Sequence, residues 1–406
     1  MRHRISALLS KRAVLRRRQY PSRANSIFSL LFIVLALPLA LLVLPIVVLL
    51  TIFKRRKLHL AVLDIDNEFA PFIEIMEYLR AGKDFETKWD FLLILSKYSH
   101  ETLDDLYAEQ LNSLIIRRHG FSGLVQQVLL LQPNTFLSVT RLVGSRTFSL
   151  PDSELSVSDA LITLRNETLN DLEIDHDNFV AMAVFTLQYD EERDPREARK
   201  VAILESHGDG LVAGVDYLRE SDIDVVLLGS PDTKRAKVPR DIPRLSAIGK
   251  LGGAHEVALA SVCSYFWNDS DVGAWWLGLP FKRPILTTNK PRIRMRTNLS
   301  DYEHLVVPVR YARPDGSDLT FRELLMMKSA PFKSAARGEL VMIRNSPDEI
   351  IEAHKEIRAR ISGVWSEDTQ IQKLRDRCQR IFLEFPDTFP MRISAHFLAK
   401  HAHLLD

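Results

Sequence analysis

Cysteine is scarce in this chain of 406 residues, which contains only Cys263 and Cys378. Two thiols so far apart in the sequence give neither a disulfide framework nor the C-x-x-C spacing of a zinc site. No H-E-x-x-H segment occurs either. The composition therefore favours a reducing compartment and predicts a protein without a bound metal.

The sequence also lacks the usual glycine-rich signatures of nucleotide-binding proteins. The G-x-x-x-x-G-K-[ST] loop is absent, and no G-x-G-x-x-G follows a predicted first strand. The G-x-S-x-G turn of the α/β-hydrolases is missing as well. These absences argue against P-loop, dinucleotide-dependent and serine-hydrolase activities, and we expect no cofactor.

Acidic residues are absent from the N-terminal arm, residues 1–26, whereas eight basic residues crowd into it. Such an arm can bind nucleic acid, but beside an apolar segment it favours anionic lipid headgroups. The rest of the chain is mildly acidic, so we expect membrane lipids and no nucleic acid as partners. The basic residues are Arg2, Arg4, Lys11, Arg12, Arg16, Arg17, Arg18 and Arg23.

Residues 27–53 form one long hydrophobic run whose only polar side chains are Ser29 and Thr51. As a helix this run reaches roughly 40 Å, which exceeds the hydrocarbon core of about 30 Å. We therefore predict an N-terminal membrane helix. The basic arm before it favours a cytoplasmic N-terminus and an exported body. Pro38 and Pro45 favour a kink, so a re-entrant segment with both ends on the cytoplasmic face stays open.

The remaining residues predict an α/β fold with two Rossmann-like domains. Apolar runs at 58–65, 179–187 and 224–228 are typical of buried strands, and they alternate with helix-like patterns. The polar stretch 149–177 places a domain boundary near Asp175. We expect an N-terminal domain over 57–175, a C-terminal domain over 176–340 and a C-terminal helical region over 341–406.

The helical region has a distinct start signal. Ser346 is expected at the N-cap of a helix, Pro347 at its first position, and Glu349 three residues after the cap.

Ligands of open α/β sheets bind at the carboxyl ends of the strands, and two loops there carry suitable residues. Gly229 and Ser230 directly follow the strand at 224–228, where a glycine lets the backbone approach a phosphate and a serine can donate to it. An ordinary strand-to-loop turn is the alternative interpretation of the pair.

The second loop, residues 268–273, follows an apolar run and precedes an apolar helix. Asn268 and Ser270 can hydrogen-bond a phosphate or a ribose at the helix N-terminus. Asp269 and Asp271 repel a phosphate unless a metal or a cation such as Arg283 compensates. Helix capping is the alternative interpretation.

In the first domain, His59 lies at the start of the first predicted strand, 58–65, and Asp64 and Asp66 lie at its end. A histidine or carboxylate at that position is a candidate general base for an acceptor hydroxyl. A solvated acidic turn is the alternative.

Several stretches, in the right order along the chain, resemble the family of bacterial putative surface-polysaccharide glycosyltransferases, whose members are expected to adopt the two-domain GT-B arrangement. The stretches are Lys57-Leu58-His59-Leu60-Ala61, Tyr217-Leu218 with Val225-Val226-Leu227-Leu228-Gly229, Leu319-Thr320-Phe321-Arg322-Glu323-Leu324, Arg344-Asn345-Ser346-Pro347-Asp348-Glu349-Ile350 and Ile393-Ser394-Ala395-His396-Phe397-Leu398.

The resemblance implies transfer of a sugar from a nucleotide-sugar donor to a cell-envelope glycan or a lipid-linked acceptor. It places His59 on the acceptor side, and the loop of Asp64 and Asp66 is expected to face the same cleft between the two halves. The donor side comprises Gly229, Ser230, Asn268, Ser270, Asp271 and Glu323. A cytosolic donor requires the body on the cytoplasmic face of the inner membrane.

Two positions depart from the family pattern. Gln188 stands where the family tends to carry an arginine, and Asp271 stands where a glycine is expected after Ser270. Losing a cation and gaining a carboxylate both weaken binding of a diphosphate. The alternative is therefore a non-catalytic binding or scaffolding protein on a degenerate glycosyltransferase fold.

Overall fold

The computed structural model describes residues 148–149, 157–174, 178–184, 208–229, 238–239, 241–248, 253–270, 277–294, 297–298, 303–327, 330–385, 388 and 390–406.

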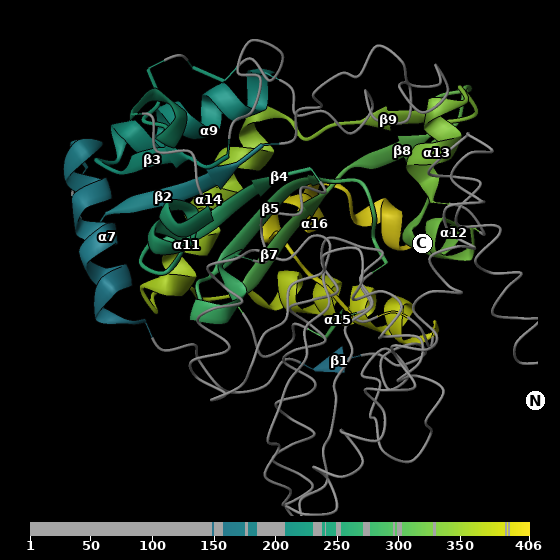
Figure 1. Cartoon of the computed structure of the whole chain (residues 1–406). Coiled ribbons are helices and arrows are strands. Elements are labelled where there is room, and N and C mark those ends of the chain that lie inside the picture. The colour runs from purple at the N-terminus through teal and green to yellow at the C-terminus, as the bar shows by residue number, and fades with distance from the viewer. Residues whose placement is uncertain are drawn as a thin grey trace, which may run out of the picture.

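A single sheet of six parallel strands forms the centre of this part of the chain (Figure 1). Its spatial order is β3-β2-β4-β5-β7-β10. The strands are β2 (Phe179–Ala183), β3 (Asp224–Leu227), β4 (Tyr265–Asp269), β5 (Ile285–Lys290), β7 (His304–Pro308) and β10 (Arg392–Ile393). The apolar runs at 179–187 and 224–228 correctly predict strands β2 and β3, because a strand covered on both faces needs an uninterrupted apolar run.

The strand order reverses direction between β2 and β4. From β2 the chain first adds β3 on one side, and then adds β4, β5, β7 and β10 on the other side. Such a reversal is the topological switch point, where open α/β sheets bind ligands beyond the carboxyl ends of the strands.

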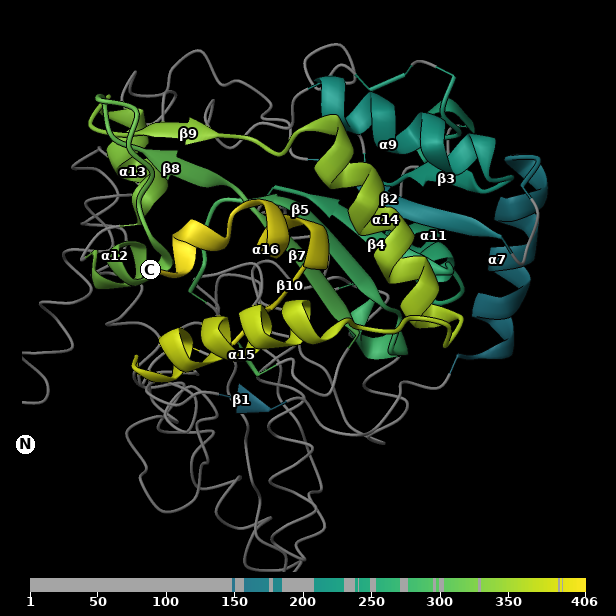
Figure 2. The same cartoon turned by 180° about the vertical axis from the view of Figure 1, so that it is seen from behind.

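Helices cover both faces of the sheet. The helix α11 (Gly253–Ala260) lies on the face turned to the viewer in Figure 1. The helix α14 (Pro347–Ile361) lies on the opposite face, which Figure 2 shows from the front. The mixed α/β architecture predicted from the alternating strands and helices is thus confirmed.

The polar stretch before β2 contains a helix that the sequence pattern does not indicate. Helix α7 (Asp159–Asp171) begins after the N-cap Ser158. It packs beside α11, where Thr168 Oγ1 lies 2.9 Å from His255 Nδ1. Although α7 precedes the predicted boundary at Asp175, its residue Leu169 is fully buried in the core around the sheet. Most of 57–175 lies outside the described residues, so the two-domain division stays a prediction.

Two glycines let helix α9 (Gly208–Glu220) approach α14 and β4 closely. A Cβ atom at Gly214 would lie 2.6 Å from the Trp267 ring and 3.1 Å from His354 Nε2. A Cβ atom at Gly210 would instead meet the terminal Cδ1 of Ile350 at 2.5 Å. The first obstacle is a rigid ring, whereas the second is the end of a flexible side chain.

Replacing Gly214 by alanine is expected to destabilise the protein by about 1–3 kcal/mol, because the added methyl group overpacks the contact with Trp267. The same replacement at Gly210 is the matched control. There Ile350 can rotate, and alanine gains about 1 kcal/mol of helix propensity over glycine. Thermal unfolding of both variants measures the difference. A Gly214→Ala protein that melts no lower than Gly210→Ala would contradict this packing.

The predicted start of α14 is confirmed in detail. Ser346 is the N-cap, Pro347 opens the helix, and Glu349 completes a capping box by accepting from the Ser346 backbone N–H at 2.8 Å. The other oxygen of Glu349 lies 2.6 Å from His401 Nε2. Although burial opposes it, these hydrogen bonds and the charge of Lys400 lower the pKa of Glu349 to about 2.

Residues 341–406 form the last elements of the chain, and the strand β10 among them pairs with β7 at the edge of the sheet. This C-terminal region contains helices, as predicted, but also two short strands. These elements are β9 (Val341–Ile343), α15 (Thr369–Leu383), α16 (Ala395–Lys400), the 3-10 helix η4 (Ala402–Leu405) and the edge strand β10.

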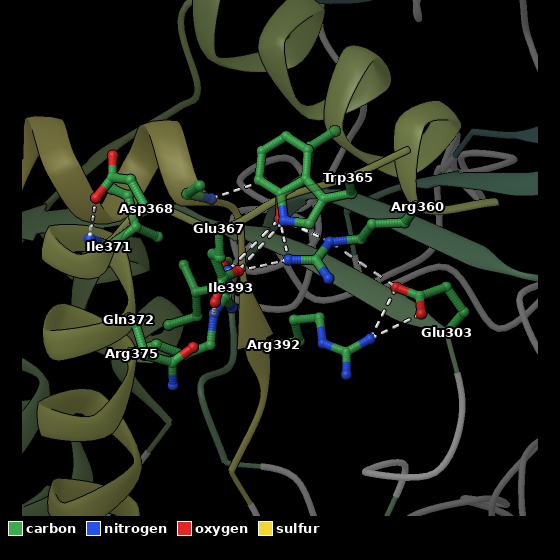
Figure 3. Close-up of polar contacts among 12 residues, drawn as sticks. Glu303, Arg360, Trp365, Glu367, Asp368, Ile371, Gln372, Arg375, Arg392 and Ile393 are labelled. Carbon is green, nitrogen blue, oxygen red and sulfur yellow. Dashed lines mark hydrogen bonds and ion pairs between the residues drawn. The ribbon is translucent and has the colours of Figure 1, made fainter. Parts of the chain in front are cut away.

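Charged side chains join α14, α15 and β10 at the amino edge of the sheet (Figure 3). Glu367 accepts from Arg360 at 2.6 Å and from Arg375 at 2.6 Å. Arg392 donates to both oxygens of Glu303 at 2.8 Å. Because Glu303 directly precedes β7 and Arg392 opens β10, the network lies at the end of the sheet opposite to the switch-point edge.

A lobe of residues 309–344 extends from the carboxyl end of β7 and returns to the start of α14 (Figure 1). It contains the antiparallel pair β8 (Arg310–Ala312) and β9, with helices α12 (Phe321–Met326) and α13 (Pro331–Ala336).

The remaining described elements are short. They are the parallel pair β1 (Phe148–Ser149) and β6 (Thr297–Asn298), and the 3-10 helices η1 (Leu245–Ile248) and η3 (Leu279–Phe281). Within the described ranges no helix has the length and apolar character to cross a bilayer. The predicted basic arm 1–26 and membrane helix 27–53 lie outside those ranges.

Candidate functional site

The candidate site lies where β4 ends, at the switch point of the sheet. Asn268 and Asp269 are fully buried, and Ser270 follows them with 1% of its surface exposed. The neighbouring strands bring Ala183 beside Asn268 and Thr288 beside Asp269. Three consecutive polar residues are thus buried at the edge where this class of sheet binds ligands.

Among the described residues, hydrogen bonds reach one oxygen of the Asp269 carboxylate but not the other. Its Oδ1 accepts from Thr288 Oγ1 at 2.8 Å and from Asn289 Nδ2 at 2.7 Å. Trp267 Nε1 donates to the same Thr288 hydroxyl at 3.0 Å, which fixes its orientation. The other carboxylate oxygen of Asp269, Oδ2, is buried and has no hydrogen-bond partner among the described residues. A buried carboxylate oxygen is costly unless a donor reaches it.

Asn268 offers a second acceptor of the same kind. Its amide nitrogen donates to the carbonyl of Ser270 at 3.2 Å, which holds the side chain across the turn. Its Oδ1 is buried and likewise accepts no hydrogen bond from the part of the chain that the structure describes. Two neighbouring residues therefore present two buried acceptors that no described residue satisfies.

The backbone at this edge adopts unusual conformations. Ser270 has φ = 65° and Asn289 has φ = 49°, so the residues just after β4 and near the end of β5 are both left-handed. Such conformations cost energy in residues other than glycine and gather at binding sites. The Ser270 backbone N–H is held by the Thr288 carbonyl at 2.8 Å.

A reciprocal pair of asparagines connects the site to α14 and to the lobe. The Asn289 backbone N–H donates to Asn345 Oδ1 at 2.5 Å, and the Asn345 backbone N–H donates to Asn289 Oδ1 at 2.8 Å. The Asn345 amide also donates to the carbonyl of Pro308 at 2.8 Å. The ends of β5, β7 and the lobe are thereby joined directly to the residue that contacts Asp269.

Gly229 lies at the same edge, directly after Leu228 that follows β3. Its φ of 73° requires a left-handed turn, which explains the glycine. Because β2 separates β3 from β4, Gly229 stands roughly 10 Å from Asn268. Burial raises the pKa of Glu256, against the effect of a hydrogen bond from the Gly229 backbone. Glu256 is a titratable residue at this edge that the sequence pattern does not single out.

Two cations bear on whether a phosphate can be bound here. Arg283 precedes β5 at the amino edge and donates to the Ser261 carbonyl at 3.0 Å. It therefore lies at the wrong end of the sheet to compensate Asp269. Lys290 ends β5 and is 5% exposed, so it brings a positive charge to the carboxyl edge.

Glu323 lies in the lobe, at the third position of α12. Its carboxylate completes a capping box with Thr320 and accepts from Arg313 at 2.5 Å. The backbone hydrogen bond from Thr320, together with Arg313, lowers its pKa despite burial. These contacts give Glu323 a structural role, and its predicted part in donor binding stays a prediction.

The structure thus brings together Asn268 and Ser270 of the predicted donor residues, with Gly229 two strands away. Ser230, Asp271, His59, Asp64 and Asp66 lie outside the described residues. Asp269, Asn289 and Asn345 are additional site residues. Asp269 and Asn289 could have been found from the sequence, because apolar residues give way to polar ones at the ends of both β4 and β5.

The two unsatisfied side-chain atoms found at this edge, Asn268 Oδ1 and Asp269 Oδ2, are both hydrogen-bond acceptors. Among the described residues, no group of three His, Cys, Asp or Glu side chains is arranged to hold a metal ion. The nearby His354 is buried against Trp267, and burial lowers its pKa to about 3, so it is neutral. The edge therefore suits a ligand that carries several hydroxyl or amino donors.

The chain shows a weak structural similarity to several solved glycosyltransferases. No protein-family model matches the chain, and no curated protein shows significant sequence similarity to it. Similar solved structures include the glycosyl transferase family 9 from Veillonella parvula DSM 2008, at 11% identity and a TM-score of 0.46, covering 75% of this chain and 98% of that one.

Two Escherichia coli enzymes are also similar. ADP-heptose lps heptosyltransferase II matches at 11% identity with a TM-score of 0.35, covering 75% of this chain and 99% of its own. Heptosyltransferase WaaC, solved with ADP-2-deoxy-2-fluoro heptose, matches at 12% identity with a TM-score of 0.30, covering 63% and 94%. At these values the likeness assigns neither an activity nor a domain arrangement to this chain.

Proposed function

We propose that this protein is a glycosyltransferase that binds a nucleotide-sugar donor at the carboxyl ends of β4 and β5 and transfers the sugar to a glycan or lipid-linked acceptor. The observation that carries the proposal is the pair of buried, unsatisfied acceptors Asn268 Oδ1 and Asp269 Oδ2 at the switch point. The sequence stretches that resemble the surface-polysaccharide glycosyltransferases support it independently.

The chemistry of the two acceptors favours the hydroxyl-bearing parts of such a donor. A sugar or ribose hydroxyl donates a hydrogen bond, whereas a phosphate at neutral pH mainly accepts and is repelled by a carboxylate. Asp269 and Asn268 therefore suit the ribose or the sugar. Lys290 at the end of the adjacent strand suits the diphosphate.

The proposal extends to the predicted N-terminal residues. His59 would be the general base that deprotonates the acceptor hydroxyl, with Asp64 or Asp66 as the alternative base. An acceptor carried on a lipid agrees with the predicted membrane segment, and a cytosolic donor requires the body on the cytoplasmic face of the inner membrane.

Hydrogen–deuterium exchange of the full chain, with a panel of nucleotide sugars and nucleoside diphosphates, tests this function. Because the acceptors are buried, a ligand must displace the chain that covers them, and its binding should change amide exchange there. We expect a matching nucleotide sugar to slow exchange in 265–270 and 285–290 and to leave α15 unchanged. Protection confined to other regions, or none with any nucleotide sugar, would contradict the proposal.

A further inference from the structure

The residues after β5 form a short basic strip at the carboxyl edge. Lys290 is buried, and from Pro291 to Arg294 exposure alternates, with Pro291 and Ile293 buried and with Arg292 and Arg294 exposed. Alternation of this kind places the two arginines on the same side of an extended segment.

Three contacts attach this strip to the lobe of residues 309–344. Tyr311 donates its hydroxyl hydrogen to the Pro291 carbonyl at 2.8 Å. The guanidinium of Arg292 lies 4.9 Å from the centre of the Phe332 ring. Arg294 donates to the carbonyl of Leu325. The strip is therefore attached to the lobe of residues 309–344. From here on, the basic lobe means residues 290–294 and 309–344 together.

The basic lobe carries a strong excess of positive charge. It contains ten basic and four acidic residues, whereas the whole chain has a net charge of only +2. Three of the acids are neutralised by arginines inside the lobe. These ion pairs are Arg310 with Asp318 at 2.7 Å, Arg313 with Glu323 at 2.5 Å, and Arg337 with Glu339 at 2.5 Å. The lobe thus suits an anionic partner.

The apolar side chains of the lobe decide between the possible anionic partners. Met326 and Val341 are 68% and 52% exposed, although both are large hydrophobic residues. All three aromatic residues of the lobe, Tyr311, Phe321 and Phe332, are buried. A single-stranded nucleic acid is typically held by aromatic stacking, for which the lobe offers no exposed ring. Basic residues beside exposed aliphatic ones are typical of a surface that binds anionic lipid.

We propose that the basic lobe docks on an anionic lipid bilayer through Arg292, Arg294, Lys333 and Met326. The lobe begins at the end of β5 and returns to Asn345, which contacts Asn289 in the candidate site. Docking therefore holds the carboxyl edge of the sheet close to the membrane, where a lipid-linked acceptor lies. The binding itself does not depend on sugar transfer, so it can be tested separately.

The test uses an environment-sensitive dye on Met326→Cys in the full chain. Cys263 and Cys378 are buried, and burial raises the pKa of each thiol to about 12, so the introduced thiol reacts selectively. The labelled protein is reconstituted in phosphatidylcholine vesicles and in vesicles with about one-third phosphatidylglycerol. We expect a blue shift of the dye only with the anionic lipid, and its loss at high salt.

Charge removal provides the second half of the test. Each neutralised side chain weakens lipid binding about 5-fold, so Arg292→Gln, Arg294→Gln and Lys333→Gln together should weaken it about 100-fold and abolish the shift. Lys373→Gln, Arg377→Gln and Arg380→Gln on α15 remove the same charge and should preserve it. A dye on Val364→Cys, which is 74% exposed beyond the end of α14, should not respond.

Three results would overturn the proposal. They are equal dye spectra in neutral and anionic vesicles, a shift that survives the loss of the three lobe charges, and a shift with an RNA oligonucleotide in place of anionic lipid. If the triple variant unfolds, the salt dependence of the parent protein decides alone, because a shift that persists at about 1 M salt is not electrostatic.

Discussion

Replacing Glu356 by alanine is expected to lower the free energy of unfolding by about 3 kcal/mol. Glu356 is 2% exposed, and its Oε1 accepts from Arg360 at 2.9 Å and from Arg375 at 3.5 Å. Its Oε2 accepts from the Ala395 backbone N–H at 2.6 Å, at the start of α16. Truncation leaves two largely buried guanidinium groups with one carboxylate fewer and leaves a buried N–H group unsatisfied.

The matched control is Glu352→Ala on the same helix. Glu352 forms an exposed pair with Lys355 at 2.7 Å, and exposed pairs contribute at most about 1 kcal/mol. Thermal or urea unfolding of both variants gives the comparison. Equal melting of the two would show that the network at the amino edge of the sheet does not hold α14, α15 and α16 together.

The parts of the fold that could be predicted from the sequence are those specified locally. Strand β2 is visible because Phe179–Ala183 is apolar throughout, and the start of α14 is visible because Ser346 and Glu349 form a capping box. Helix α7 escapes detection because most of its residues are polar and only Leu161, Thr168 and Leu169 are buried. Strand β10 has two residues, which is too short for any periodic pattern.

The candidate site could be predicted only in part, because strand pairing creates it. Asn268 and Ser270 stand out locally, as polar residues after an apolar strand. The contact between Asn289 and Asn345 joins residues 56 positions apart, and it exists because β5 and β7 are neighbours in the sheet. Arg283 illustrates the reverse case. It follows the 268–273 loop closely in sequence, but β5 begins after it, so it lies at the opposite edge.

Asp269→Asn is expected to weaken binding of the matching nucleotide sugar by about 10- to 100-fold without lowering the melting temperature. The substitution keeps an oxygen for Thr288 and Asn289 but turns the unsatisfied acceptor Oδ2 into a donor. A lost hydrogen bond to a charged group costs about 1.5–3 kcal/mol, which corresponds to that loss of affinity. The protein itself is not expected to be destabilised, because the substitution keeps the shape of the side chain and changes only an oxygen, Oδ2, that no described residue bonds.

This titration tests the central claim most directly, namely that the end of β4 is where the donor binds. Calorimetry of the parent protein, Asp269→Asn and the distant, exposed Asp376→Asn, each against the nucleotide sugar identified by hydrogen exchange, gives three affinities. We predict that Asp376→Asn binds like the parent and that Asp269→Asn binds at least about 10-fold more weakly at the same melting temperature. Equal affinities for all three proteins would contradict the proposed donor site.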